Sequence, residues 1–145
     1  MNELVELSRD KCEELLRAAI VGRVVFETGD GPQIVPVNYT TVGDAVVFRT
    51  SPYSQLGTHA DGSRLLLEID HIDYDGHRGW SVVAVGTGEV LEDTEELEAA
   101  GPFWNPKPWA AGQRLLYVRM PWHRLTGRRI GAGWTFENEL PVRRP

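Results

Sequence analysis

The sequence contains very little cysteine, because Cys12 is the only one in 145 residues. A single cysteine cannot form an intramolecular disulfide, and no cysteine and histidine residues stand at the spacing of a zinc site. A chain of this length buries roughly 70% of the surface that it exposes when unfolded, so it needs neither a disulfide nor a metal for stability. We therefore expect one domain over residues 1–145, and the lack of disulfides favours a reducing compartment, the cytoplasm.

Long apolar runs and a broad basic surface are also missing. The amino-terminal segment is acidic, and no run approaches the ~20 apolar residues of a membrane helix. The formal net charge is −6 at pH 7, with acidic residues dominating before position 107 and basic residues after it. A nucleic-acid-binding protein needs a wide basic stripe that neutralises many phosphates. We expect neither a membrane nor a nucleic acid as a partner, while one small phosphate group stays compatible with this charge.

Common catalytic and metal-binding motifs are incomplete. GTGEVL at Gly86 and GAGWTF at Gly131 lack the third glycine and the strand-to-helix setting of a dinucleotide site. DHIDYDG (residues 70–76) has its acidic residues at the wrong positions for a calcium loop, and we interpret it as a solvated turn. His71 and His77, six residues apart in this turn, give poor metal-ligand geometry with the neighbouring aspartates. No serine lies in a nucleophile elbow.

The residues after Ser8 predict one short amphipathic helix. Ser8 is a suitable N-cap residue. Apolar residues follow at the i, i+3, i+4, i+7 spacing of one helical face, namely Cys12, Leu15, Leu16 and Ala19. Gly22 ends the pattern. Cys12 is therefore expected in the core and not as a nucleophile.

After this helix the apolar period changes to two. Alternation predicts strands over residues 24–26, 33–42, 45–50, 64–70, 80–91, 114–120 and 123–130. Turn residues separate the first three strands, at 28–32 (TGDGP) and at Gly43-Asp44. One helical turn is expected at 55–59 and a short acidic helix at 94–100. A connector rich in proline and tryptophan follows at 101–112.

This order of elements predicts a mainly β fold with peripheral helices. It shows no alternation of strand and helix, which argues against a parallel sheet. An antiparallel barrel fits best, because closing the sheet removes its exposed edges. Gly86 and Gly88 within the long strand predict a bend or bulge there.

Polar side chains gather near the ends of consecutive strands and could bind an anion. Arg49 and Thr50 end one strand, and Ser54 and Gln55 open the turn after it. A guanidinium offers a fixed fork for two phosphate oxygens, and hydroxyl groups add short hydrogen bonds. An alternative stays open, in which Arg49 pairs with a surface carboxylate and Ser54 is only a helix cap.

The run from Leu7 to about Asp93 resembles the pyridoxamine 5'-phosphate oxidase-like, FMN-binding split-barrel family, in particular its nitroimidazole-resistance-type branch. The resemblance depends on five segments in order: LSRDKCEELLRAAIVGRVVF, IVPVNY, VVFRT with the serine-containing turn after it, LLLEID and GWSVVAVGTGEV. No single segment is diagnostic, but the ordered set is fairly specific. The resemblance implies an antiparallel split β-barrel that forms a homodimer, with FMN in a groove between the subunits.

The resemblance also implies a set of cofactor-binding residues. The positions concerned are Pro36, Val37, Asn38 and Tyr39 beside the isoalloxazine ring, Phe48, Arg49 and Thr50 along the ribityl chain, Ser54 and Gln55 at the phosphate, and Trp80 and Ser81 approaching the ring from the long strand. The strand at 36–39 would act largely through its backbone, since a flavin edge alternates donors and acceptors. Gln55 departs from the family, which often has lysine there. Arg49, Arg128 or Arg129 could supply the missing charge.

The aromatic residues keep a simpler interpretation. Tyr39, Phe48 and Trp80 lie at strand positions where aromatic side chains normally form the core. Trp104, Trp109, Trp122 and Trp134 are numerous for a chain of this length, and we expect them mainly at an interface.

The resemblance therefore implies a flavin-dependent oxidoreductase that uses FMN, or a related deazaflavin, to transfer hydride or electrons between a reduced nicotinamide and a small acceptor. The flavin performs the chemistry in such proteins, so no residue needs to be named as a catalytic base. Gln55 motivates an alternative from another class: a dimeric binding protein that carries flavin or haem without turnover, or that has no cofactor.

Overall fold

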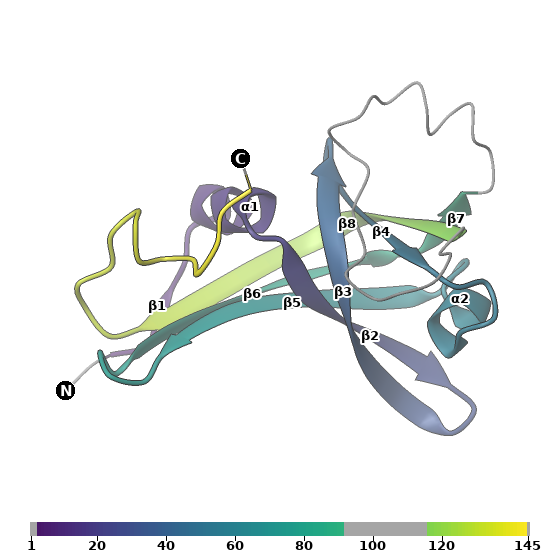
Figure 1. Ribbon diagram of the computed structural model, residues 1–145, viewed down its shortest axis with the longest axis horizontal. Helices are drawn as coiled ribbons and strands as arrows, with labels where there is room; N and C mark the ends of the chain where they lie inside the picture. Colours follow the sequence, from purple (N-terminus) through teal and green to yellow (C-terminus); the bar gives the residue numbers. More distant parts are fainter. Residues whose placement is uncertain (1–2, 92–115, 145) are drawn as a thin grey trace.

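The structure, a computed structural model, describes residues 3–91 and 116–144. Its elements in order are β1 (Val5–Glu6), α1 (Arg9–Ala18), β2 (Val21–Thr28), β3 (Gly31–Val42), β4 (Ala45–Thr50), α2 (Gln55–His59), β5 (Arg64–Asp73), β6 (Arg78–Thr87), β7 (Glu89–Leu91) and β8 (Leu116–Ile130) (Figure 1). The helix predicted at 94–100, the connector at 101–112 and both Trp104 and Trp109 lie outside the described residues.

Six strands close into a ring, which confirms the predicted mainly β, antiparallel split barrel. The hydrogen-bonded order is β8-β4-β3-β2-β5-β6, and β6 pairs back onto β8. Every neighbouring pair is antiparallel. β5, β6 and β8 run side by side as the long layer of the molecule, with α1 beside them and α2 at the far end (Figure 1). β1, which the sequence did not predict, adds to the edge of β8.

The last strand corrects the prediction of two separate strands at 114–120 and 123–130. β8 is one continuous strand of 15 residues. Its first part pairs with β4 and its second part with β6, so a single strand spans both sheets of the barrel. Near the point where β8 changes partner, its pairing with β6 shifts in register between Val85 and Gly86. Pro121 interrupts the local pattern but not the strand, because the tertiary pairing on both sides holds it extended.

The predicted bend in the long strand is confirmed at its two glycines. β6 ends at Thr87 and β7 begins at Glu89, so the break falls at Gly88. Gly86 packs so closely on β8 that a Cβ atom there would overlap the carbonyl oxygen of Pro121. Glycine is needed at this position because two backbones approach each other directly.

α1 packs its apolar face into the barrel, as its spacing predicts. Ser8 is the N-cap, its Oγ accepting a hydrogen bond from the Lys11 N–H. Cys12, Leu15 and Leu16 are almost fully buried, which confirms Cys12 as a core residue. The side chain of Trp122 also lies in the core, so its predicted place at an interface is wrong. It occupies the inward face of β8, which it shares with Met120.

The C-terminal tail (residues 131–144) covers one end of the barrel beside α1 (Figure 1). Trp80 Nε1 donates a 2.6 Å hydrogen bond to the carbonyl oxygen of Glu139. The Arg144 guanidinium donates to the carbonyl oxygens of Ala19 and Tyr39, and the Arg144 N–H donates to Ala18 at 2.7 Å. The tail is thus tied to α1, β3 and β6, although no sequence pattern predicted it.

Candidate functional site

The end of β4 and the start of α2 form a polar corner, which we call the β4–α2 corner (residues 49–55). Ser54 is the N-cap of α2, and its Oγ accepts a 2.9 Å hydrogen bond from the Gly57 N–H. The same Oγ donates to the Ser51 carbonyl oxygen at 2.7 Å and lies 2.9 Å from Thr50 Oγ1. The sequence-predicted hydroxyl groups of Thr50 and Ser54 are therefore in direct contact, and the exposed side chain of Gln55 follows them.

Arg49 lies on the other face of β4 from Thr50. Thr50 is buried, whereas Arg49 is half-buried, with its Cζ 5.1 Å from the centre of the Tyr117 ring on β8. Successive residues of a strand point to opposite faces, so the guanidinium and the hydroxyl pair meet one ligand only where the strand ends. The corner brings these groups to the same place in the fold but not to the same face of the sheet.

The strand segment 36–39 would present mainly backbone atoms to a ligand, together with the exposed pyrrolidine ring of Pro36. Pro36 is exposed on the outer face, and Val37 packs against the core. Tyr39 is buried, with its hydroxyl donating a 2.6 Å hydrogen bond to the Leu16 carbonyl oxygen, and burial raises the pKa of this phenol. Its register partner Phe48 is equally buried. Both aromatic side chains are core residues, so a ligand beside them would meet backbone atoms. Asn38, which precedes Tyr39 on β3 and pairs with Val21 of β2, is half-buried.

Trp80 and Ser81 belong to a different part of the barrel. Ser81 pairs with Arg128 of β8, whereas Thr50 pairs with Leu116 of the same strand. The two positions on β8 are separated by about 40 Å of extended chain at about 3.3 Å per residue. The residues that the sequence assigned to one cofactor therefore form two groups, and one copy of the chain does not bring them together.

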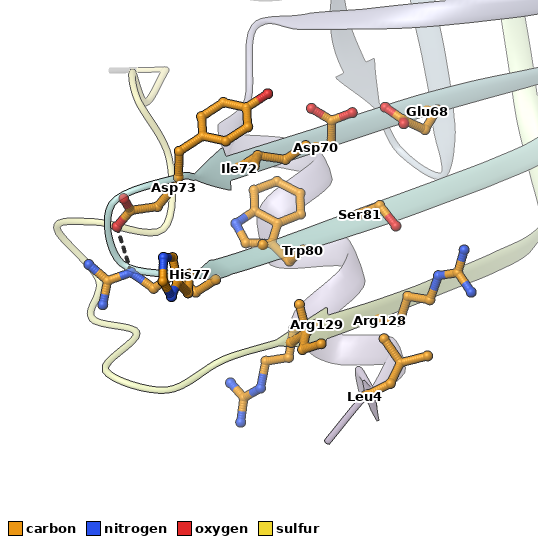
Figure 2. A pocket seen from close by; sticks show the side chains of 14 residues that line it. Leu4, Glu68, Asp70, Ile72, Asp73, His77, Trp80, Ser81, Arg128 and Arg129 are labelled. Atoms are coloured by element: carbon orange, nitrogen blue, oxygen red, sulfur yellow. Dashed lines mark hydrogen bonds and ion pairs between the residues drawn. The ribbon is translucent and has the colours of Figure 1, made fainter. Parts of the chain in front are cut away.

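A cavity of about 540 Å³ lies beside Trp80 and Ser81, at the open end of β5, β6 and β8; we call it the sheet-end cavity (Figure 2). Three exposed apolar side chains, Leu4, Ile72 and Ile130, contribute to its wall. Arg128 and Arg129, which the sequence singled out as alternative cations, line it from β8. The indole of Trp80 itself lies in the core, where its Nε1 donates a hydrogen bond to the C-terminal tail.

Sequence reasoning missed a charged cluster on the outer face, formed by Arg23, Glu68 and Asp70. Arg23 Nη1 donates to Glu68 Oε1 at 3.3 Å and to Asp70 Oδ2 at 2.9 Å. Burial, together with the neighbouring Asp70 carboxyl group, raises the pKa of Glu68 to about 7. The sequence did indicate that the two carboxylates share the outer face of β5, because Glu68 and Asp70 alternate with the inward Leu67 and Ile69. Their pairing with Arg23, which is 45 residues from Glu68 and 47 from Asp70, was not visible in the sequence.

This raised pKa predicts a pH-dependent stability. Between about pH 4.5 and pH 7 the folded protein keeps a proton on Glu68 that the unfolded chain releases, so the free energy of unfolding should fall as the pH rises through that window. In Glu68→Gln this fall should disappear. Urea unfolding of both proteins at about pH 5 and about pH 8 measures it, with Glu27→Gln, an exposed position of β2, as the control. An unchanged pH profile in Glu68→Gln would contradict the assignment.

The predicted turn at 70–76 is wrong in its first part, because β5 continues through Asp73 and the chain turns at residues 74–77 before β6. Asp73 accepts a hydrogen bond from the Gly76 N–H at 2.9 Å and pairs with Arg78 at 2.8 Å, and both contacts lower the pKa of its carboxyl group.

No three histidine, cysteine or acidic side chains come together as a metal site within residues 3–91 and 116–144. In the same residues, no helix has the length and apolar character needed to cross a membrane.

Comparisons with known proteins agree with this architecture. An uncharacterized protein of Mycobacterium tuberculosis is 34% identical over 125 residues, which cover 83% of this chain and 72% of that protein. A Corynebacterium glutamicum structure, described provisionally as a pyridoxamine 5'-phosphate oxidase, is 29% identical with a TM-score of 0.72 and covers 92% of this chain and 98% of its own. An FAD-binding protein from Mycobacterium smegmatis is 27% identical with a TM-score of 0.71, covering 88% and 99%.

The sequence match extends through nearly all of the ring. Residues 8–129 match the family described as pyridoxamine 5'-phosphate oxidase, from the cap of α1 to the last but one residue of β8. The match includes the β4–α2 corner, the segment 36–39, and both Trp80 and Ser81. The chain belongs to the pyridoxamine 5'-phosphate oxidase-like split-barrel family, because its sequence matches the family, its strands close into an antiparallel ring and similar structures have been solved.

Proposed function

We propose that this protein is a flavin-dependent oxidoreductase that binds FMN through the β4–α2 corner. The observation that carries the proposal is the donor set of that corner: the Arg49 guanidinium, the Thr50 and Ser54 hydroxyls 2.9 Å apart, and the Gln55 carboxamide. A cation and two hydroxyl groups that meet where a strand ends are suited to a phosphate monoester. The segment 36–39 adjoins the corner through the Tyr39–Phe48 pair and presents backbone to a flat ring.

A second copy of the chain would complete the site. Ser81 and Trp80 lie far from the corner in one chain, so their predicted approach to the flavin requires a partner subunit. The outer face of the long layer suits a two-fold interface, because Glu68 and Asp70 on β5 and the exposed Arg124 and Arg128 on β8 are complementary in charge. The interface would also cover the exposed apolar residues of the sheet-end cavity. We therefore propose a homodimer.

The residues of the chain would bind and orient the cofactor, while bound flavin would supply hydride or electron transfer between a reduced nicotinamide and a small acceptor. Similarity to the M. smegmatis FAD-binding protein supports a flavin but not the choice of FMN. We propose FMN in preference to a deazaflavin because the donor groups of the β4–α2 corner fit one phosphate group. Gln55 favours one alternative, a carrier that binds flavin without turnover, since a neutral amide replaces the lysine common in the family.

The proposal is tested by titrating the purified protein with FMN while its absorption spectrum and its mass by sedimentation are followed. We expect a dimer that binds FMN and then consumes a reduced nicotinamide. Arg128→Glu should shift the protein toward a monomer and weaken FMN binding, whereas Arg9→Glu, on the exposed side of α1, should do neither. An FMN absorption spectrum that does not change when the protein is added would overturn the proposal. Bound flavin without any turnover would favour the carrier.

A further inference from the structure

A second pocket lies between the C-terminal tail and the start of β2 and β3; we call it the tail pocket. It has a volume of about 310 Å³, in the range of small-molecule sites. Ile20, Val21 and Pro36 form one apolar wall, and Pro141 and Val142 of the tail contribute to the other. A slot with apolar walls of this size suits a single planar ring.

The wall made by the tail is held in place by contacts on both sides of the pocket. On one side, Trp80 Nε1 bonds to the Glu139 carbonyl oxygen at 2.6 Å, and on the other the Arg144 guanidinium bonds to the carbonyl oxygens of Ala19 and Tyr39. Arg144 also lies 5.4 Å from the centre of the Tyr39 ring. Residues 140–142 are therefore fixed between two anchors, so the pocket is preformed.

The tail pocket has one polar end, where Arg23 and Asp70 line it. These side chains form a pair with Nη1 and Oδ2 2.9 Å apart, and about half of the Arg23 side chain remains exposed. A guanidinium beside a carboxylate presents a donor next to an acceptor. A primary carboxamide is the matching group, because its oxygen accepts and its N–H on the same side donates.

We propose that the tail pocket binds a planar ring that bears a primary carboxamide. The inference rests on the proposed function in one respect: Pro36 lines the pocket and belongs to the segment that would adjoin the flavin ring. The reduced nicotinamide proposed as a reductant carries this ring and this group. The tail pocket would then be the reductant site, and residues 140–142 would help to select the ring.

Four probes that share a phenyl ring test the polar end, each titrated into flavin-free protein and followed by amide chemical shifts. Benzamide should bind about tenfold more tightly than acetophenone, which keeps the carbonyl but replaces NH₂ by CH₃, because one hydrogen bond to a charged acceptor is lost. Benzoate and benzylamine should also bind more weakly than benzamide, since each matches only one member of the Arg23–Asp70 pair. Equal affinity for all four probes, or no shift at the pocket residues, would overturn the inference.

Two variants locate the binding. Asp70→Ala should bring the benzamide-to-acetophenone ratio close to one, and Val142→Trp should weaken both probes by filling the slot. Ile34→Trp, an exposed position of the same strand as Pro36 that lies outside the pocket, should change neither affinity. Thermal unfolding checks that each variant folds.

Adding FMN separates this inference from the proposed function. If FMN and benzamide bind together, the tail pocket is a site distinct from the flavin. If FMN displaces benzamide competitively, the pocket holds the flavin ring and the inference fails, although the proposed function stands. Benzamide binding in a protein that never binds FMN would support the tail pocket as a carboxamide site and would overturn only the proposed flavin binding.

Discussion

Arg49→Ala is expected to weaken FMN binding by about 30- to 100-fold while leaving the affinity for riboflavin, which lacks the phosphate, within about twofold. The reason is the loss of a planar fork that donates two charge-assisted hydrogen bonds, together worth about 2 to 2.8 kcal/mol at a half-buried site. Fluorescence quenching titrations with both flavins measure the two affinities. A parallel loss for FMN and riboflavin would point to damage of the ring site, and no loss for either would contradict the phosphate assignment.

Two further variants sharpen this result. Arg49→Lys should recover only part of the FMN affinity, because a point charge replaces a fixed fork. Arg119→Ala is the matched control: Arg119 is a partly exposed arginine on the neighbouring β8, paired with Glu89 at 2.7 Å and outside the β4–α2 corner. Its removal deletes the same charge from the same region without touching the proposed phosphate site, so FMN affinity should stay unchanged.

Gly86→Ala is expected to lower the free energy of unfolding by about 3 kcal/mol or more. The added Cβ would overlap the carbonyl oxygen of Pro121 and come within 2.9 Å of Met120 Cγ. The first neighbour is backbone, so relief requires β6 and β8 to separate at the register shift that closes the barrel. Relative to wild type, Tm should fall by roughly 6 to 12 °C for a chain of this size.

Gly29→Ala is the control for this effect. Gly29 lies in the turn between β2 and β3, and a Cβ atom there would meet nothing within 4 Å. Its stability should match wild type within about 0.5 kcal/mol, as for other surface substitutions. If both variants were equally stable, the close packing of Gly86 on β8 could not be essential for closing the barrel.

Local elements of this fold could be predicted because their signals lie within a few residues. Ser8 and Ser54 are the N-caps of α1 and α2, and each accepts its hydrogen bond from an N–H three residues ahead. The turn at Gly43-Asp44 joins two strands whose alternation is visible without any partner. Such features depend on short-range geometry, which a sequence pattern records directly.

The environment of individual side chains could not be predicted in the same way. Trp122 was expected at an interface but is in the core, and two predicted strands are one strand, β8. Both outcomes depend on pairing with β4 and β6, which lie far away in the chain. The pairing of Arg23 with Glu68 and Asp70 is equally long-range. Strand register decides these contacts, and no local pattern encodes it.

By itself, the sequence determined the order of the elements from α1 to β6, the antiparallel barrel and the family, because alternation, caps and ordered motifs can be recognised without knowledge of contacts. Only the tertiary structure decided that Arg49 and Thr50 face opposite sides of β4, that the two groups of predicted site residues lie far apart along β8, and that the C-terminal tail encloses a pocket beside Pro36. The physical reason is that a ligand site depends on which distant backbones pair and in which register, and this is settled when the barrel closes.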